Sequence, residues 1–220
     1  MEIRTRAPTL IPRPETEEWT FKLSKIVQPT LTRPISLLDI GTGTGCIPLL
    51  LCHLWPKGTV SACGVDISDD ALTLARENAA LHDIPPDSSS GEENTFQAKR
   101  ANILHPDFAT YVSPPYDVVT SNPPYITFAE FIELPKSISQ YEDPKALFGG
   151  PTEGLDFYYA ISRVLATDGF LRDNAVVALE IGDQQGEQVK EMLDLSGRFR
   201  RTEIWKDVWK MDRTVVGWAR

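Results

Sequence analysis

The sequence predicts an α/β fold: a doubly wound, mostly parallel sheet of seven strands with one antiparallel strand. Three observations predict it. Short apolar runs alternate with amphipathic stretches along most of the 220 residues. The last two strand-like runs are joined by a short link, which suits an antiparallel hairpin. A glycine-rich turn follows the first apolar run, where sheets of this class hold ligands.

The chain begins with a helix, a strand and a second helix. Residues 15–27 have apolar residues near helical spacing, and Thr16 can cap this helix. Residues 35–40 form a short apolar run that leads into glycines, as a buried parallel strand does before a tight turn. Residues 46–55 are apolar almost throughout, which predicts a helix covered by other elements.

The next unit repeats this order. Residues 60–67 predict a second strand, which ends near Asp66. Ser68 can cap a helix over residues 69–82, whose first turn is acidic, as the helix dipole prefers. Residues 85–94 are rich in proline, serine and acidic residues and are expected to form a surface loop.

The middle of the chain supplies two more strands and a helix. Residues 95–103 predict the third strand, and residues 116–121 predict the fourth. Residues 154–167 place apolar residues along one helical face. The helix is therefore expected to pack on the sheet.

The last elements close the sheet. Residues 175–181 predict a fifth strand, apolar throughout, and residues 184–195 predict the following helix. Residues 201–205 and 214–218 are the last two strands. Their short connection makes one of them antiparallel to the rest.

Composition excludes several function classes. The net charge is −9, from 22 Lys+Arg against 31 Asp+Glu, which disfavours a protein that grips a nucleic-acid backbone. Three cysteines lack metal-ligand spacing and three histidines are scattered, so we expect no metal site and reduced thiols in an intracellular protein. No apolar run is long enough to span a bilayer, and we expect no membrane association.

Polar or glycine features follow each of the first four predicted strands. They are the glycine turn, Asp66, Asn102 and Asn122. Because the carboxyl ends of parallel strands meet at one edge of a sheet, these features are expected to line one cleft.

The glycine turn runs from Asp39 to Cys46 with the sequence DIGTGTGC. Asp66 follows Gly45 by 21 residues, near the spacing at which an acidic residue meets a ribose hydroxyl. The pattern is neither G-x-G-x-x-G nor a P-loop, so it suits a nucleotide without a pyrophosphate, such as S-adenosylmethionine. The alternative is a tight turn with a surface aspartate.

The fourth strand is followed by Asn122-Pro123-Pro124-Tyr125. The two prolines cannot donate backbone hydrogen bonds and hold the chain extended. Asn122 offers an amide and Tyr125 an aromatic face, which suits a site that grips a planar nitrogen group. The alternative is a proline-rich loop after a strand.

The chain resembles the release-factor glutamine methyltransferase family, and the likeness runs through nearly its whole length. The motifs that carry it are IPRPETE (residues 11–17), the glycine turn, SNPPY (121–125), YEDPKALFGG (141–150), GLD (154–156) and LEIG (179–182).

The resemblance implies a Rossmann-like methyltransferase. It would transfer a methyl group from S-adenosylmethionine to the side-chain amide of the glutamine in the Gly-Gly-Gln motif of a class I peptide release factor. Asn122 and the Pro123 carbonyl would accept hydrogen bonds from that amide, and Tyr125 would pack over it. Pro124 completes the catalytic turn. The residues implied to line the methyl donor are Asp39, Gly41, Thr42, Gly43, Thr44, Gly45, Asp66, Ile67, Asn102, Ile103 and Asn122.

Two departures from the family pattern stand out. Asn102 takes the place of the usual aspartate after the third strand and cannot supply a negative charge. We expect the helical domain that usually precedes the catalytic domain in the family to be absent. Residues 1–220 are therefore expected to form the catalytic domain, with residues 1–30 as a covering segment.

Two other functions stay open at this point: an amino methyltransferase that acts on DNA or RNA, and a non-catalytic relative that binds the cofactor. The motif spellings resemble the organellar branch, so we expect a mitochondrial location, with the cytoplasm as the alternative. We expect a monomer that contacts the release factor transiently.

Overall fold

The computed structural model describes residues 1–88, 91–133 and 141–220. Its strands are β1 (Ile35–Ile40), β2 (Val60–Asp66), β3 (Thr95–Arg100), β4 (Tyr116–Ser121), β5 (Leu171–Glu180), β6 (Phe199–Lys206) and β7 (Asp212–Ala219). Its helices are α1 (Pro14–Ile26), α2 (Cys46–Leu54), α3 (Asp69–Leu81), the 3₁₀ turn η1 (Phe108–Thr110), α4 (Phe128–Ile132), α6 (Pro144–Leu147), α7 (Asp156–Leu165) and α8 (Gly186–Leu195).

The seven strands form one sheet in the order β3-β2-β1-β4-β5-β7-β6. β7 runs antiparallel to both of its neighbours, and the other pairs are parallel, as the sequence predicts. The winding direction reverses between β1 and β4. In open sheets of this class that switch point is where ligands bind.

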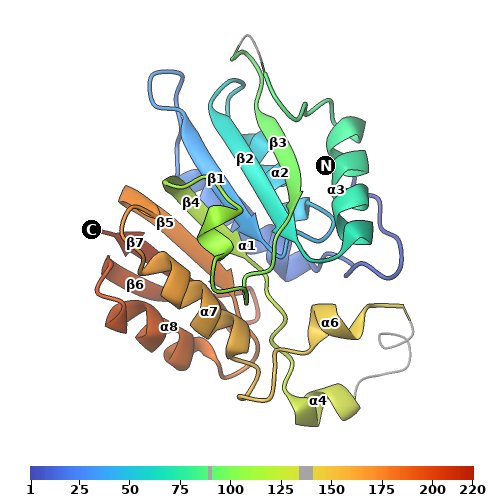
Figure 1. Cartoon of the computed structure of the whole chain (residues 1–220), viewed down its shortest axis with the longest axis vertical. Coiled ribbons are helices and arrows are strands. Elements are labelled where there is room, and N and C mark those ends of the chain that lie inside the picture. The colour runs from blue at the N-terminus through green and yellow to red at the C-terminus, as the bar shows by residue number, and fades with distance from the viewer. Residues whose placement is uncertain (89–90, 134–140) are drawn as a thin grey trace.

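Helices cover both faces of the sheet (Figure 1). The first core cluster joins the sheet to α7 and α8, and the second joins it to α1, α2 and α3. β5 shows how the strands serve both: Val177 and Leu179 enter the first cluster, whereas Val176 and Ala178 enter the second. A strand buried on both faces reads as an unbroken apolar run, which is why the sequence identified it.

Most elements differ from their predicted ranges by one or two residues at an end, and the larger differences concern β3, β5 and two short helices. β3 ends at Arg100, so Asn102 and Ile103 lie in the turn that follows the strand rather than in it. β5 begins at Leu171 and is longer than expected. The short helices α4 and α6 were not predicted, because four or five residues are too few to show a helical period.

Ser68 caps α3 as expected, because its hydroxyl accepts a hydrogen bond from the Ala71 backbone N–H. The prediction for Thr16 is wrong. α1 begins one residue after Arg13, so Thr16 lies inside the first turn and is buried. Its hydroxyl hydrogen-bonds to Glu180 instead of capping the helix. No helix in the described part of the chain is long and apolar enough to cross a membrane.

Candidate active site

A cavity of about 290 Å³ lies at the carboxyl ends of the parallel strands. Two structures bound it. The first, which we call the rim, consists of the turns after β1, β2, β3 and β4. The second, which we call the loop wall, consists of Pro8, Thr9 and Leu10 together with Asp143, Lys145 and Ala146. The cavity therefore lies where the sheet topology predicts a ligand site.

The glycine turn forms the part of the rim that follows β1. Gly41, Gly43 and Gly45 have φ values of 72°, 53° and 79°, a left-handed conformation that glycine adopts without steric cost. The turn is tied to β2, because the backbone N–H of Gly41 donates to the Val65 carbonyl at 2.8 Å. A Cβ atom built on Gly41 would lie 3.8 Å from the backbone carbonyl oxygen of Asn122. The glycine turn and Asn122 are thus neighbours, and both line the cavity, as the sequence predicts.

Asp66 lines the cavity at the end of β2. Its Oδ2 accepts from the Gly43 N–H at 3.0 Å and its Oδ1 accepts from the Ser68 N–H at 2.9 Å. Burial raises the pKa of this carboxyl group, against the lowering effect of these hydrogen bonds. Each carboxylate oxygen keeps a second lone pair, so Asp66 can brace the glycine turn and still accept from ligand hydroxyls.

Asp39 lies beneath the glycine turn and is fully buried. Its Oδ1 accepts from the Thr120 hydroxyl at 2.7 Å, whereas its Oδ2 has no hydrogen-bond partner within the residues that the structure describes. The hydroxyls of Thr42 and Thr44 are buried and unpartnered as well. Burial raises the pKa of Asp39 to about 7. Burying polar groups is costly, and this cluster lies beneath the glycine turn rather than in the cavity.

Asn122, Pro123 and Pro124 line the cavity at the end of β4. Tyr125 does not line it. Its ring lies against Gly182, where a Cβ atom would come within 2.9 Å of it, and its carbonyl accepts from the Gln185 side chain. Burial, with the Glu180 carboxylate adding to it, raises the pKa of Tyr125 to about 12. Packing of Tyr125 over a target amide therefore stays a prediction.

The other predicted cofactor residues divide into two groups. Ile67, Asn102 and Ile103 line the cavity beside Gly41, Gly43 and Asp66. Asp39, Thr42, Thr44 and Gly45 lie outside its lining, so they shape the turn from below. The Asn102 side chain is occupied in part, because its Oδ1 accepts from the Leu104 N–H at 3.0 Å.

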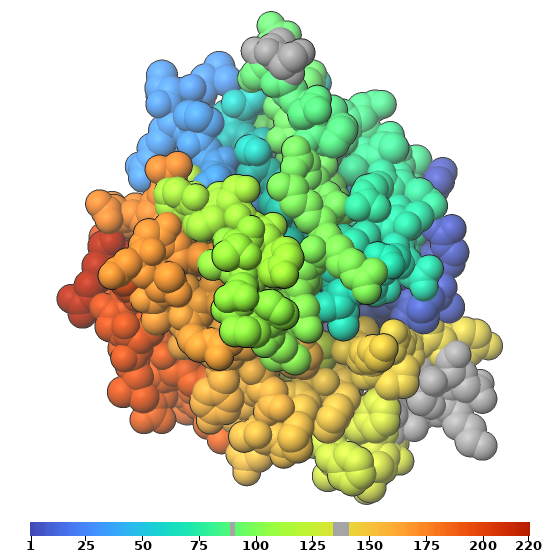
Figure 2. Space-filling model, viewed as in Figure 1, coloured from blue at the N-terminus to red at the C-terminus, as the bar shows by residue number. Residues whose placement is uncertain are grey.

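Most of the loop wall leaves no signal in the sequence. From its neighbours in the sequence, Arg13 would be expected to face the cleft or to pair with Glu15 or Glu17. The structure instead pairs Arg13 with Glu142, through two hydrogen bonds of 2.8 and 2.9 Å. The Asp143 N–H also donates to the Pro8 carbonyl at 2.8 Å. Figure 2 shows the N-terminal residues and the segment after 140 meeting at one edge of the molecule.

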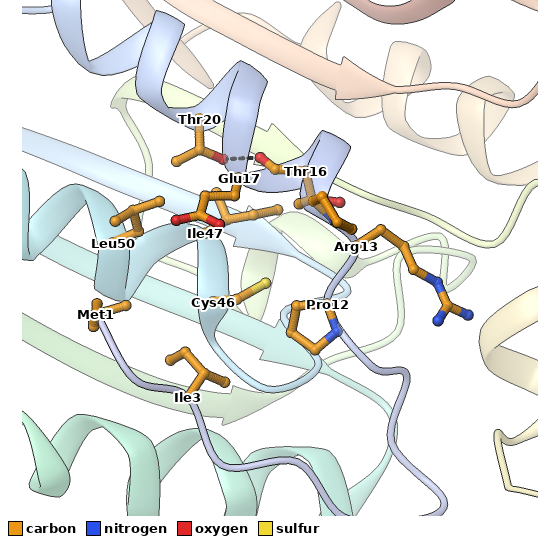
Figure 3. Close-up of a pocket in the computed structure, with 11 residues that line it drawn as sticks. Met1, Ile3, Pro12, Arg13, Thr16, Glu17, Thr20, Cys46, Ile47 and Leu50 are labelled. Atoms are coloured by element: carbon orange, nitrogen blue, oxygen red, sulfur yellow. Dashed lines mark hydrogen bonds between the residues drawn. The ribbon is translucent and has the colours of Figure 1, made fainter. Parts of the chain in front are cut away.

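A second hollow, of about 200 Å³, lies between the N-terminal segment, α1 and α2. Figure 3 shows Thr16, Thr20 and Cys46 around it, with the Arg13 side chain pointing away toward the other side. Most of its lining is apolar, and Thr20 donates to the Thr16 carbonyl. This hollow and the strand-end cavity share no lining residue.

The tryptophans and arginines near the C-terminus lie outside the cavity. Trp205 and Trp218 pack together, whereas Trp209 is exposed. The arginines near residue 200 are paired along the sheet edge: Arg198 with Asp168, Arg200 with Asn174 and Arg201 with Glu203. In the described residues, no group of three histidine, cysteine or acidic side chains could hold a metal ion.

Comparison with known proteins finds methyltransferases, both by sequence and by structure. Residues 22–132 match the family model described as "Methyltransferase small domain". A release factor glutamine methyltransferase from Flavobacterium psychrophilum is 35% identical over 94% of this chain and 67% of that protein. One from Streptococcus pneumoniae is 36% identical over 98% of the chain and 69% of that protein. A methyltransferase structure from Pyrococcus furiosus shares the fold, with a TM-score of 0.65 and 16% identity. The match covers 98% of this chain and 87% of that one.

Proposed function

The chain belongs to the release factor glutamine methyltransferase family, and we propose that it methylates the glutamine side-chain amide in the Gly-Gly-Gln motif of a class I peptide release factor. The chain spans about two thirds of the length of the relatives it matches. One geometric observation supports the proposal beyond family membership. Gly41 and Gly43 of the glycine turn, Asp66 and Asn122 line the same cavity.

The residues of the rim fit S-adenosylmethionine. Asp66 lines the cavity and has spare lone pairs for ribose hydroxyls, and the glycines of the turn let a ligand approach the backbone closely. Ile67 and Ile103 offer apolar surface for a planar base. When bound there, this cofactor supplies an electrophilic methyl group for transfer to nitrogen.

The target nitrogen is a weak nucleophile, because its lone pair is delocalised into the amide carbonyl. No histidine lies among the residues that line the cavity. Catalysis is therefore expected to come from positioning and local electrostatics. Asn122 and the Pro123 carbonyl would accept hydrogen bonds from both amide hydrogens, which fixes the nitrogen and stabilises the positive charge that develops on it.

A radiolabel transfer assay tests the proposal. Purified protein is incubated with labelled S-adenosylmethionine and a class I release factor, and in parallel with DNA and RNA. Label should enter the release factor only, and replacement of the Gly-Gly-Gln glutamine by alanine should abolish it. Transfer to nucleic acid, or to the alanine variant, would overturn the assignment. Cofactor binding without any transfer would indicate a non-catalytic relative.

A further inference from the structure

A buried chain of hydrogen bonds links helix α1 to the asparagine of the candidate active site. The Trp19 indole N–H donates to Glu180 Oε2 at 2.7 Å, and the Thr16 hydroxyl donates to the same oxygen at 2.7 Å. The Asn122 Nδ2 donates to the Thr16 hydroxyl oxygen at 3.4 Å. Thr16, Trp19 and Glu180 are 3%, 3% and 1% exposed, so water does not compete for the contacts among them, whereas Asn122 is half-buried.

The direction of each hydrogen bond in this chain is fixed by chemistry. An indole N–H can only donate, so Glu180 Oε2 must be an acceptor where it meets Trp19. The Thr16 hydroxyl has a single hydrogen, which it gives to that carboxylate oxygen. Only lone pairs remain on the Thr16 oxygen. It can therefore accept from the nitrogen of the Asn122 amide but cannot pair with the carbonyl oxygen of that amide.

This restriction decides which way the Asn122 amide faces. The two ends of an asparagine amide have nearly the same shape, so neighbouring hydrogen bonds select the orientation. With Nδ2 directed to Thr16, Oδ1 is the end left for the cavity. It accepts from no residue that the structure describes, and it is not among the buried side-chain atoms that lack a partner.

We propose that Thr16 and Glu180 are positioning residues that hold the Asn122 amide with its oxygen toward the target nitrogen. The inference rests on the proposed function, because a glutamine amide nitrogen carries two hydrogens and needs an acceptor. A reversed Asn122 would present N–H groups to N–H groups. Helix α1 therefore orients the active site through its buried face.

A competing explanation is that the chain of hydrogen bonds only docks α1 onto the sheet. Thr20 separates the two explanations. It lies one turn further along α1, is 1% exposed, and its hydroxyl donates at 2.7 Å to the Thr16 carbonyl. Thr20→Val loses a buried hydroxyl from the same helix, and that hydroxyl hydrogen-bonds to the Thr16 carbonyl rather than to Glu180 or Asn122.

The first experiment compares Thr16→Val, Thr16→Ser and Thr20→Val with the wild-type chain. We measure kcat on a release factor, cofactor affinity by calorimetry, and Tm. Thr16→Val should lower kcat about tenfold or more, because the Asn122 amide would lose the hydrogen bond that sets its orientation. Cofactor affinity should stay within about twofold of the wild-type value. Thr16→Ser keeps the hydroxyl and should restore kcat. Equal kcat values for Thr16→Val and Thr20→Val at equal Tm would overturn the proposal.

The second experiment does not depend on turnover. Proton–nitrogen NMR follows the two Nδ2 hydrogens of Asn122, assigned by their disappearance in Asn122→Ala. One of them should exchange slowly with solvent in the wild type, Thr16→Ser and Thr20→Val, and rapidly in Thr16→Val. Slow exchange in all four would overturn the proposal. A wild type that shows this pattern but does not methylate a release factor would instead overturn the proposed function.

Discussion

The rim and the loop wall bound the same cavity, but different forces hold them. Rim residues sit at strand ends, where backbone hydrogen bonds such as Gly41 to Val65 at 2.8 Å fix them to the sheet. The loop wall is held by contacts between loops, among them the Arg13–Glu142 ion pair and the backbone hydrogen bonds from Asp143 to Pro8 and from Ile126 to Leu147. The rim is part of the fold, whereas the loop wall is added to it. Substitutions in the two should therefore differ in size and in kind.

The largest effect is expected at the rim residue closest to the chemistry. Asn122→Ala removes the acceptor proposed to hold the target amide, and loss of one such group from a preorganised site typically lowers kcat by about 10² to 10³. Single-turnover transfer to a release factor measures it. Cofactor affinity should stay within a few-fold.

Asn102→Ala provides the matched control for Asn122→Ala. Asn102 also lines the cavity, but its side chain is exposed and its Oδ1 bonds to the neighbouring Leu104 N–H. We expect a change in kcat of less than threefold. A similar loss in both variants would show that the rim acts as a general cofactor surface rather than through Asn122.

The second prediction concerns the free energy of unfolding and Asp39, the buried carboxyl group near the end of β1, beneath the rim. Burial raises the pKa of Asp39 from 3.8 to about 7, so the folded state favours the protonated form. Stabilisation from this group is complete below pH 3.8 and is lost as the pH rises through 7. Between pH 5 and pH 8 the free energy of unfolding should fall by roughly 3 kcal/mol on this account.

Denaturant unfolding of Asp39→Asn at several pH values tests this prediction. The variant should have a flatter pH profile than the wild type and should be the more stable protein at pH 8. Asp87→Asn, in the exposed loop before β3, removes one carboxylate without burial and should keep the wild-type slope. If Asp39→Asn kept the wild-type slope of unfolding free energy against pH, a partner would stabilise the charged carboxylate in the folded protein, and the prediction would be wrong.

The third prediction tests the double role of Asp66. Asp66→Ala removes the brace on Gly43 and the proposed contact with ribose hydroxyls. Hydrogen bonds to charged groups contribute about 1.5–3 kcal/mol, so cofactor affinity should fall tenfold or more. Calorimetry measures it. Asp143→Asn changes a carboxyl group on the opposite wall and should cost less, and the reverse order would mean that the loop wall makes the stronger contacts.

The contrast between rim and loop wall also explains what the sequence could predict. β1 and β4 match the predicted ranges, because apolar runs mark strands that are buried on both faces. Once the strands are placed, topology brings Gly41, Asp66 and Asn122 to one edge. No further information was needed to place these residues around one cavity.

The loop wall could not be predicted in this way. Arg13 and Glu142 lie 129 positions apart, and their contact leaves no periodic trace. Local reasoning offered Glu15 and Glu17 as partners because they are near in sequence. Thr16 shows the same limit: a threonine near a helix start resembles a cap, and only the position of Glu180 in the folded sheet gives its hydroxyl another partner.

The smallest expected effect belongs to the loop wall. Glu142→Gln keeps the size of the side chain but removes the charge that Arg13 pairs with. The Glu142 side chain is 3% exposed and the Arg13 side chain 37%, so solvent screens part of the interaction. Cofactor affinity should fall about threefold, mainly through faster dissociation, because the wall opens more often. Stopped-flow dissociation measures the rate at which the cofactor leaves.

Glu17→Gln is the control, because it removes an exposed charge on α1 that lies near Arg13 in the sequence. It should leave the dissociation rate unchanged. If Glu17→Gln had the larger effect, the loop wall would be held by α1 itself, and the distinction between a wall added by distant contacts and a rim built into the sheet would fail.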